Sequence, residues 1–255
     1  MRNFATVIMA AGKGTRMKNP EKAKVMFEVQ GKPMIEHVVD LAISLKSTRI
    51  ITIVGYQRES VMAHLKKVTP EIEFAVQEPQ LGTGHAVMQT RNLLGDFQGD
   101  VLVLSGDVPL LRESTIRELI ACQHQKKAVA TILTADLDDP SGYGRILRDQ
   151  DDHVIGIVEH RDASEEQRNI REINSGIYIF DNTHMFDALA HINPHNAQNE
   201  YYLTDVFGYY WKHRMKVAAK KAEDFDEIRG VNTADQLEVA NAVMQKQKEV
   251  RARIA

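Results

Sequence analysis

The chain has few of the features that mark secreted, membrane-spanning or nucleic-acid-binding proteins. It has one cysteine, Cys122, which excludes an internal disulfide and, inside an expected helix, indicates a core thiol rather than a nucleophile. No apolar run approaches the ~20 residues that cross a bilayer. The formal net charge is only -3, without the basic stripe of a nucleic-acid binder. We therefore expect a folded, cytoplasmic protein that binds neither nucleic acid nor membrane.

Short β-rich runs alternate with helical patterns along the first half of the chain. The expected strands span residues 4–9, 49–54, 71–76, 100–104 and 128–133. The expected helices between them span residues 33–46, 58–66, 84–94 and 113–125. This alternation predicts an α/β fold with a Rossmann-like, mostly parallel, doubly wound sheet, whose ligands bind at the carboxyl ends of the strands.

The pattern changes after about residue 133. Shorter strands are expected at 144–148, 153–159 and 172–180, with the acidic stretch 149–152 as a turn. They predict a small, β-rich, partly antiparallel subdomain laid against the first sheet. The last third of the chain returns to helix, at 199–213 and 233–254.

Residues 9–17 are the most informative stretch, because they follow an apolar strand and combine glycines with basic residues. The two glycines let the backbone approach a ligand closely, and Lys13 and Arg16 add positive charge that suits a triphosphate. Met17 stands where a dinucleotide-binding fingerprint needs a third glycine, and no lysine follows the second glycine as in a P-loop. A tight turn after an edge strand is the alternative.

A single carboxylate, Asp107, follows the buried strand at 100–104 and a glycine. At that strand end it should face the ligand crevice, and its oxygens are the hard ligands that Mg²⁺ prefers. Mg²⁺ is commonly held by only one or two protein groups, together with waters and substrate phosphates. Alternatively, Asp107 is an N-cap or turn residue before Pro109.

Another glycine-rich loop follows the strand at 71–76. Gln77 offers a paired donor and acceptor, which suits the edge of a pyrimidine base. Gly82 and Gly84 would let a base lie against the backbone. The alternative for this loop is that Thr83 simply caps the next helix.

Together and in this order, these segments resemble the uridyltransferase domain of bacterial bifunctional N-acetylglucosamine-1-phosphate uridyltransferases/glucosamine-1-phosphate acetyltransferases, within the sugar-nucleotide pyrophosphorylase family. The resemblance covers nearly the whole chain. Its motifs are Gly12-Lys13-Gly14-Thr15-Arg16-Met17, Gln77 with Leu81-Gly82-Thr83-Gly84-His85-Ala86, Ser105-Gly106-Asp107-Val108-Pro109-Leu110, Asp139-Pro140-Ser141-Gly142-Tyr143-Gly144-Arg145, Ile157-Val158-Glu159-His160, Glu172-Ile173-Asn174-Ser175-Gly176, Glu200-Tyr201-Tyr202-Leu203-Thr204-Asp205 and Gly230-Val231-Asn232.

The resemblance implies a nucleotidyltransferase-type Rossmann-like fold and a Mg²⁺-dependent reaction. UTP and N-acetylglucosamine 1-phosphate would give UDP-N-acetylglucosamine and pyrophosphate, feeding cell-envelope polysaccharide synthesis. The sugar phosphate is already an anionic nucleophile, so in-line attack on the α-phosphate needs neither a general base nor a covalent intermediate. That chemistry agrees with a sequence that shows no Ser-His-Asp or Cys-His arrangement and no metal-ligand spacing among its ten histidines.

The resemblance also implies roles for individual residues. It assigns nucleotide binding to Met9, Ala10, Ala11, Gly12, Gln77, Gly82 and Thr83, catalytic phosphate contacts to Arg16 and Lys24, Mg²⁺ to Asp107 and Asn232, and the N-acetylglucosamine moiety to Gly144, Glu159 and Asn174. Without the resemblance, Glu159 would be interpreted as a strand-end surface residue and Asn174 as a turn cap.

Several departures from the family pattern are visible. The family usually has Leu-Pro-Lys where this chain has Lys22-Ala23-Lys24, with one extra residue after Arg16. Lys24 is the better alignment, Lys22 competes with it, and the missing proline frees the local backbone. Asn199 replaces a glycine, a mild change because asparagine tolerates a left-handed backbone.

We expect a single nucleotidyltransferase domain over residues 1–255, with a nucleotide-binding part at about 1–134, a sugar-binding part at about 135–230 and a C-terminal helix at 231–255. The segment 246–254 resembles the arm that precedes the left-handed β-helix in the bifunctional proteins. The hexapeptide repeats of that β-helix are not in this sequence, so we expect no acetyltransferase activity from it. The oligomeric state stays open.

Two alternatives to the favoured function remain. The substrates could be another sugar 1-phosphate or dTTP, because a few pocket contacts decide such selectivity. The chain could also be a non-catalytic sugar-nucleotide sensor, since a fold does not guarantee activity. The joint presence of Arg16, Lys24, Asp107 and Asn232 speaks against the sensor.

Overall fold

The structure, a computed structural model, describes residues 2–254. Its strands are β1 (Phe4–Ala10), β2 (Glu28–Val29), β3 (Lys32–Pro33), β4 (Arg49–Val54), β5 (Glu73–Val76), β6 (Asp100–Ser105), β7 (Ala130–Asp136), β8 (Arg145–Arg148), β9 (Val154–Val158), β10 (Glu172–Asp181) and β11 (Val217–Lys221). Its α-helices are α1 (Met34–Ser44), α2 (Arg58–Val68), α3 (Thr83–Met88), α4 (Arg91–Leu94), α5 (Glu113–Lys126), α6 (Glu165–Arg168), α7 (Asn182–Leu189), α8 (Asp205–Lys212), α9 (Phe225–Ile228) and α10 (Ala234–Ile254).

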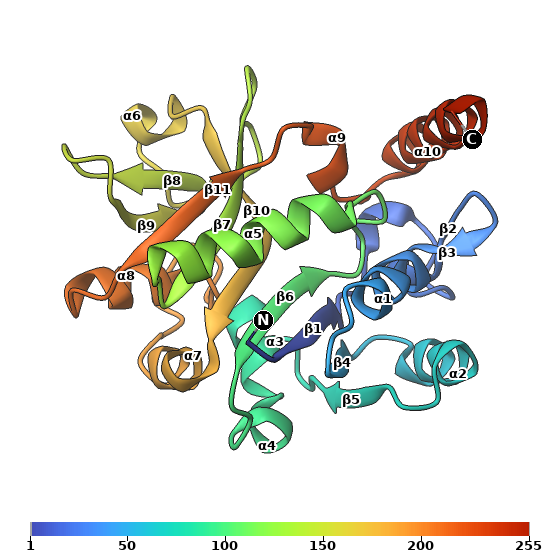
Figure 1. The fold of residues 1–255 in the computed structure, drawn as a ribbon, viewed down its shortest axis with the longest axis horizontal. Helices are drawn as coiled ribbons and strands as arrows, with labels where there is room; N and C mark the ends of the chain where they lie inside the picture. The colour runs from blue at the N-terminus through green and yellow to red at the C-terminus, as the bar shows by residue number, and fades with distance from the viewer. Residues whose placement is uncertain (1, 255) are drawn as a thin grey trace.

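One mixed, mostly parallel sheet forms the centre of the molecule, in the order β11-β7-β10-β6-β1-β4-β5 (Figure 1). β1 pairs in parallel with β4 and β6, β4 with β5, and β7 with β11. β10 runs antiparallel between β6 and β7 and also pairs with β8, which in turn pairs with β9. The mostly parallel α/β sheet expected from the sequence is confirmed.

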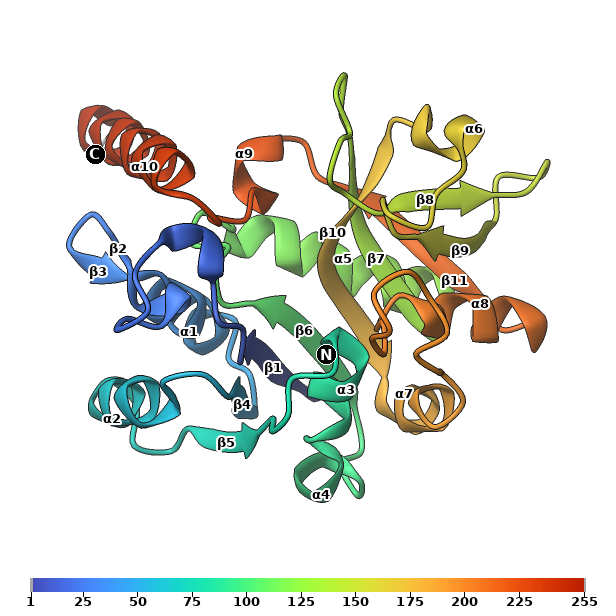
Figure 2. The same cartoon turned by 180° about the vertical axis from the view of Figure 1, so that it is seen from behind.

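Helices cover both faces of the sheet because its strands are apolar on both sides. Along β1, Ile8 packs in a core with residues of α1, α2 and α5, whereas its neighbour Val7 packs in a second core with residues of α3, α7 and α8. Figure 1 shows α5 across one face, and the reverse view in Figure 2 shows α3, α7 and α8 on the other. Successive strand residues point to opposite faces, so each strand contributes to both cores.

The connection before α8 differs from the expected helix at 199–213. Residues 199–204 are not α-helical, and α8 begins only at Asp205. Asn199 has a φ of 53°, outside the helical region. The backbone of Tyr201 is engaged elsewhere, since its N–H donates to the Leu81 carbonyl at 2.8 Å and its carbonyl accepts from the Gly84 N–H at 2.7 Å. Tertiary pairing with the loop at 81–84 therefore replaces a helical turn.

Two further expectations need correction. The helix expected at 84–94 is divided into α3 and α4. The strand expected in the small subdomain, at 172–180, is β10, which lies in the middle of the central sheet and also carries β8. β11 and α7 were not anticipated, because β11 is a short edge strand with two lysines and α7 is only two turns long.

The last helix, α10, packs on the β2–β3 hairpin. A separate small core joins them, in which Ala240 of α10 and Val29 of the hairpin pack with Met34, Leu110 and Val231. The backbone N–H of residue 30 also donates to the Asn241 side chain at 2.7 Å. Among the described residues, no helix is both long enough and apolar enough to cross a membrane.

Candidate functional site

A cavity of about 320 Å³ opens where β1, β5 and β6 end. Every residue to which the resemblance assigned nucleotide binding lines it, together with Lys24 and Asp107. The lining also includes residues that the sequence analysis did not assign to the site, namely Val25, Gln80, Ala86, Ser105 and Glu200. Of these residues, Ser105 was the easiest to predict from the sequence, because it ends β6 two residues before Asp107.

The loop after β1 closes on Lys24. Gly14 has a φ of 61°, and a Cβ at this position would lie 2.4 Å from the Cβ of Lys24. Glycine is therefore required here for contact with the protein's own lysine. This corrects the sequence-based reason for that glycine, which was close approach to a ligand. At Gly12, by contrast, a Cβ would meet nothing within 4 Å.

Lys24, Asp107, Asn232 and Arg16 meet at one point. The Lys24 ammonium lies 2.5 Å from Asp107 Oδ2 and donates to Asn232 Oδ1 at 3.0 Å. The exposed Arg16 also donates to Asn232 Oδ1, at 3.0 Å. The structure thus brings together the two expected catalytic cations and the two expected metal ligands, which come from distant parts of the sequence.

The competing residue, Lys22, lies elsewhere. Its ammonium is 3.8 Å from Glu28 and lies 5.2 Å from the centre of the Phe27 ring. Between the two lysines, the geometry therefore favours Lys24 for the cavity.

Asp107 is not the N-cap of the next helix. The N-cap residue of α5 is Arg112, while the Asp107 carboxylate pairs with Lys24. The N-cap alternative for Asp107 is therefore wrong, although the residue does lie in a turn.

A second cavity, of about 260 Å³, shares Ser105 and Asp107 with the first. Its lining also includes Arg16, Tyr143 and Asn232. Asp107 thus lies between two spaces, an arrangement that can hold two ligands whose charged groups meet at this carboxylate.

The oxygens at this meeting point fit a magnesium ion. Asp107 Oδ2 and Asn232 Oδ1 lie 2.5 and 3.0 Å from the same ammonium nitrogen, so both can reach one cation. Carboxylate and amide oxygens are hard ligands of the type that Mg²⁺ selects, and water or phosphate oxygens commonly complete its octahedron. In this structure the Lys24 ammonium occupies the cation position between them.

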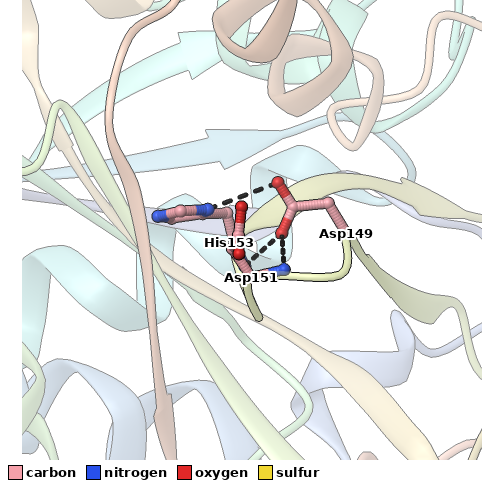
Figure 3. A group of neighbouring side chains, drawn as sticks. All are labelled: Asp149, Asp151 and His153. Carbon is pink, nitrogen blue, oxygen red and sulfur yellow. Dashed lines mark hydrogen bonds and ion pairs between the residues drawn. The ribbon is translucent and has the colours of Figure 1, made fainter.

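A different acidic group lies in the turn between β8 and β9, where Asp149, Asp151 and His153 gather (Figure 3). Asp149 Oδ1 accepts hydrogen bonds from the backbone N–H groups of Asp151 at 3.0 Å and His153 at 2.8 Å. Asp149 Oδ2 lies 3.3 Å from His153 Nδ1. These contacts account for the group as a closed turn, in agreement with the turn expected at 149–152.

The loop after β5 is built around a buried glutamine. Gln77 is only 3% exposed, and its Nε2 donates to the Gly82 carbonyl at 2.9 Å. Gly82 has a φ of 109°, and a Cβ there would lie 2.6 Å from the Tyr201 carbonyl oxygen. The loop is thus held against the chain before α8, and Gly82 cannot be replaced without strain.

Thr83 does not cap α3. It is the first residue of that helix, whose N-cap residue is Gly82, and its Oγ1 accepts from the Leu203 N–H at 3.0 Å. The capping alternative for Thr83 is therefore wrong, and the hydroxyl instead helps to hold the loop to residues 201–203.

Three residues come together from different segments: Gly144 precedes β8, Glu159 follows β9, and Asn174 lies in β10. The Asn174 N–H donates to the Gly144 carbonyl at 2.9 Å, and a Cβ on Gly144 would lie 3.5 Å from Glu159 Oε2. Neither cavity includes these three residues in its lining, but Gly144 and Asn174 are adjacent in sequence to Tyr143 and Ser175, which line the second cavity.

Glu159 is half-buried, so it is not simply a surface residue. Its Oε1 accepts from Thr204 Oγ1 at 2.9 Å. Burial raises the pKa of Glu159; Asp162 and Glu200 add to that increase, and the Thr204 hydrogen bond opposes it. The interpretation of Asn174 as a turn cap is correct, since its Oδ1 accepts from the Gly176 N–H at 3.1 Å.

Comparisons with known proteins agree with this architecture. The family model described as "Nucleotidyl transferase" matches residues 5–248. The chain is 48% identical over 246 residues to "Bifunctional protein GlmU" of Enterococcus faecalis, covering 96% of this chain and 53% of that protein. It is 46% identical to the protein of the same name from Streptococcus mutans, covering 96% of this chain and 52% of that protein. The chain therefore spans about half the length of these relatives.

Solved structures show the same fold at low sequence identity. One is a putative glucose-1-phosphate thymidylyltransferase from Bacillus anthracis, with a TM-score of 0.74, 22% identity and 94% of each chain covered. Another is a UDP-glucose pyrophosphorylase complexed with UDP-glucose, with a TM-score of 0.76, 18% identity and coverage of 97% of this chain and 100% of that one.

Proposed function

Because the chain belongs to the nucleotidyl transferase family, we propose that it is a uridyltransferase. It would convert UTP and N-acetylglucosamine 1-phosphate into UDP-N-acetylglucosamine and pyrophosphate, with Mg²⁺. The observation that carries this proposal is the convergence of Lys24, Asp107, Asn232 and Arg16 where two cavities meet. The sequence identity of 48% and 46% to two bifunctional GlmU proteins, over 96% of the chain, supports the choice of reaction.

The first cavity would hold the nucleotide. The backbone at Met9 to Gly12 can cradle it, because the small side chains of Ala10, Ala11 and Gly12 let a ligand approach the main chain closely. Gln77, Gly82 and Thr83 line the same cavity and would read the uracil edge through side-chain and backbone groups. The Gln77 Nε2 carries two hydrogens; it donates to the Gly82 carbonyl at 2.9 Å and lies 3.3 Å from His85 Nδ1. With both of these contacts made, the side-chain carbonyl oxygen is the group left to accept from the base.

Two cations of the chain would serve the triphosphate. Arg16 is exposed and close to Asn232, so it would neutralise the triphosphate and the departing pyrophosphate. Lys24 would leave its contacts with Asp107 and Asn232 to reach the phosphates at the reacting centre. Mg²⁺, when bound by Asp107 and Asn232, would neutralise charge on the nucleotide and sugar phosphates.

The sugar would lie by Gly144, Glu159 and Asn174. A carboxylate whose pKa is raised by burial gains from a hydroxyl donor, and a sugar supplies several. The sugar phosphate would enter the second cavity and approach Asp107 from that side, opposite the nucleotide. Alignment and charge neutralisation then suffice for in-line attack, without a general base.

The test is pyrophosphate release by the purified protein with UTP and Mg²⁺. N-acetylglucosamine 1-phosphate is compared with glucose 1-phosphate and glucosamine 1-phosphate, and dTTP replaces UTP as the base control. Strong preference for UTP and the acetylated sugar is expected. Preference for another sugar or base would keep the chemistry and change the specificity, whereas no release with any pair would favour a sugar-nucleotide sensor.

Asp107→Asn tests the proposed metal site, because it keeps the shape of the side chain and removes its charge. We expect it to abolish Mg²⁺-dependent turnover in a folded protein. Near-normal turnover with Mg²⁺ would remove Asp107 from the metal site. We also propose that the enzyme works in the cytoplasm and feeds cell-envelope polysaccharide synthesis, the use to which its product is suited.

A further inference from the structure

A buried carboxylate joins the two loops that carry Asp107 and Asn232. Glu227, in α9, is 2% exposed and is not part of the lining of either cavity. Its Oε2 accepts from Thr115 Oγ1 at 2.5 Å, and its Oε1 lies 3.0 Å from Arg112 Nη1. We call Arg112, Thr115 and Glu227 the clamp.

The clamp connects the start of α5 to α9. Arg112 ends the loop that carries Asp107, which runs from β6 to α5. Its Nη2 also donates at 2.6 Å to Oδ2 of Asp224, which is the N-cap residue of α9. Asn232 follows α9 after a short segment, and within that segment the Val231 N–H donates to the Asp107 carbonyl at 2.9 Å. Asp107 and Asn232 are far apart in sequence, so these tertiary contacts fix their separation.

A charged group in this position needs a reason beyond packing. Burying a carboxylate is costly unless it is paired and hydrogen-bonded, and an apolar residue would fill the same space at lower cost. The Glu227 carboxylate, however, contacts one hydroxyl and one guanidinium at the start of α5, and these directional contacts fix the orientation of α9 relative to α5. Mg²⁺ demands near-ideal octahedral geometry at about 2.0–2.1 Å, so its ligands must be held closely.

We propose that Arg112, Thr115 and Glu227 are positioning residues for the metal site, which set the separation of Asp107 Oδ2 and Asn232 Oδ1. This inference rests on the proposed function, in which those two oxygens hold Mg²⁺. Changes to groups that orient metal ligands typically lower metal affinity about 10- to 100-fold. We therefore expect loss of the clamp to weaken metal binding more than it slows turnover at saturating metal.

The experiment compares two clamp variants with two matched controls. Thr115→Val removes the hydroxyl and keeps the shape, whereas Thr115→Ser keeps the hydroxyl. Arg112→Gln removes the guanidinium that links α5 to α9. Arg117→Gln removes an equally exposed arginine, since both side chains are 38% exposed. Arg117 pairs with Glu113 at 2.6 Å and donates to the Ser44 carbonyl of α1 at 3.4 Å, so these contacts do not link α5 to α9.

The main measurement is Mn²⁺ binding to each folded variant saturated with UDP-N-acetylglucosamine, followed by the electron paramagnetic resonance signal of free Mn²⁺. We expect the Kd for Mn²⁺ to rise about tenfold in Thr115→Val and Arg112→Gln. It should change less than about twofold in Thr115→Ser and Arg117→Gln, which leave the clamp intact. In turnover assays, the clamp variants should need more Mg²⁺ for half-maximal rate and keep kcat at saturating Mg²⁺.

The outcomes separate this inference from the proposed function. Unchanged Mn²⁺ affinity in both clamp variants would overturn the positioning role while the metal site stands. If the unmodified protein binds no Mn²⁺, or if Asp107→Asn binds Mn²⁺ as tightly as the unmodified protein, the proposed metal site is refuted. The positioning role of the clamp is then refuted with it. Should Thr115→Val fail to fold, Arg112→Gln decides the question, because its guanidinium lies at a partly exposed edge.

Discussion

The carboxylate of Asp205 should make folding stability fall as pH rises. Asp205 begins α8 beside Glu159 and Asp162. Burial, and then the charges of those two acids, raise the pKa of Asp205 from 3.8 to about 6. Between these values the folded chain binds more protons than the unfolded chain, so stability is fully present below pH 3.8 and is lost as pH rises through 6.

The size of this effect follows from the shift. About two pKa units correspond to an upper limit of about 3 kcal/mol. The helix N-terminus at α8 favours the ionised form by about 0.3–1 kcal/mol, and Asp205 is only half-buried, so we expect about 1–2 kcal/mol. Asp205→Asn removes the charge and keeps the shape. Because the carboxyl group in the unfolded chain is already mostly ionised at pH 4.5, about two-thirds of this effect falls between pH 4.5 and pH 8. The variant should therefore gain about 0.7–1.3 kcal/mol more over the unmodified protein at pH 8 than at pH 4.5.

Urea unfolding at pH 4.5, 6 and 8 measures this difference. Asp235→Asn is the matched control, because Asp235 lies in the first turn of α10 and is exposed. Its effect should stay within about 0.5 kcal/mol at every pH. If Asp205→Asn changes stability equally at pH 4.5 and pH 8, or becomes more destabilising as pH rises, the reasoning from burial is refuted.

Three further changes test particular positions. Lys24→Ala should lower kcat at least about 100-fold in the pyrophosphate assay, whereas Lys22→Ala should change it less than about twofold; the reverse order would show that the other lysine serves the phosphates. Ala23→Pro should raise stability by about 0.4–1 kcal/mol in urea unfolding, because φ at this residue is -57°, which proline adopts; a loss would mean that the ring does not fit. Gly82→Ala should cost about 1–3 kcal/mol, owing to its φ of 109° and a clash with a backbone carbonyl oxygen. Gly156→Ala, where a Cβ meets nothing within 4 Å, is its control, and equal effects in the two variants would contradict the strain at 82.

The sequence predicted most of the central sheet because its strands are apolar on both faces. The strand expected at 49–54 has those bounds in the structure, as β4. The motif residues that follow β1, β5 and β6 line one cavity, since the carboxyl ends of parallel strands share an edge of the sheet. The left-handed backbone expected to suit Asn199 is confirmed by its φ of 53°.

Other features depend on contacts between distant segments, which local pattern does not reveal. Residues 199–204 fail to form a helix because Tyr201 pairs with the loop at 81–84. Glutamate is usually found at the surface, and only the contacts of Glu227 with Thr115 and Arg112 explain its burial. The preference for Lys24 over Lys22 likewise follows from tertiary contacts, including the close approach of Gly14 to the Lys24 Cβ.

The antiparallel strand β10 limits how the molecule can move. Its second half pairs with β6, and Ile173 near its start pairs with Arg145 of β8. The proposed nucleotide site and the proposed sugar site therefore share one continuous strand, which links their positions. The register shift between Asn174 and Tyr178, where Gly176 has a φ of 80°, is the irregular point along its length. Inserting or deleting one residue at this bulge would turn Asn174, a residue of the proposed sugar site, to the opposite face of the sheet.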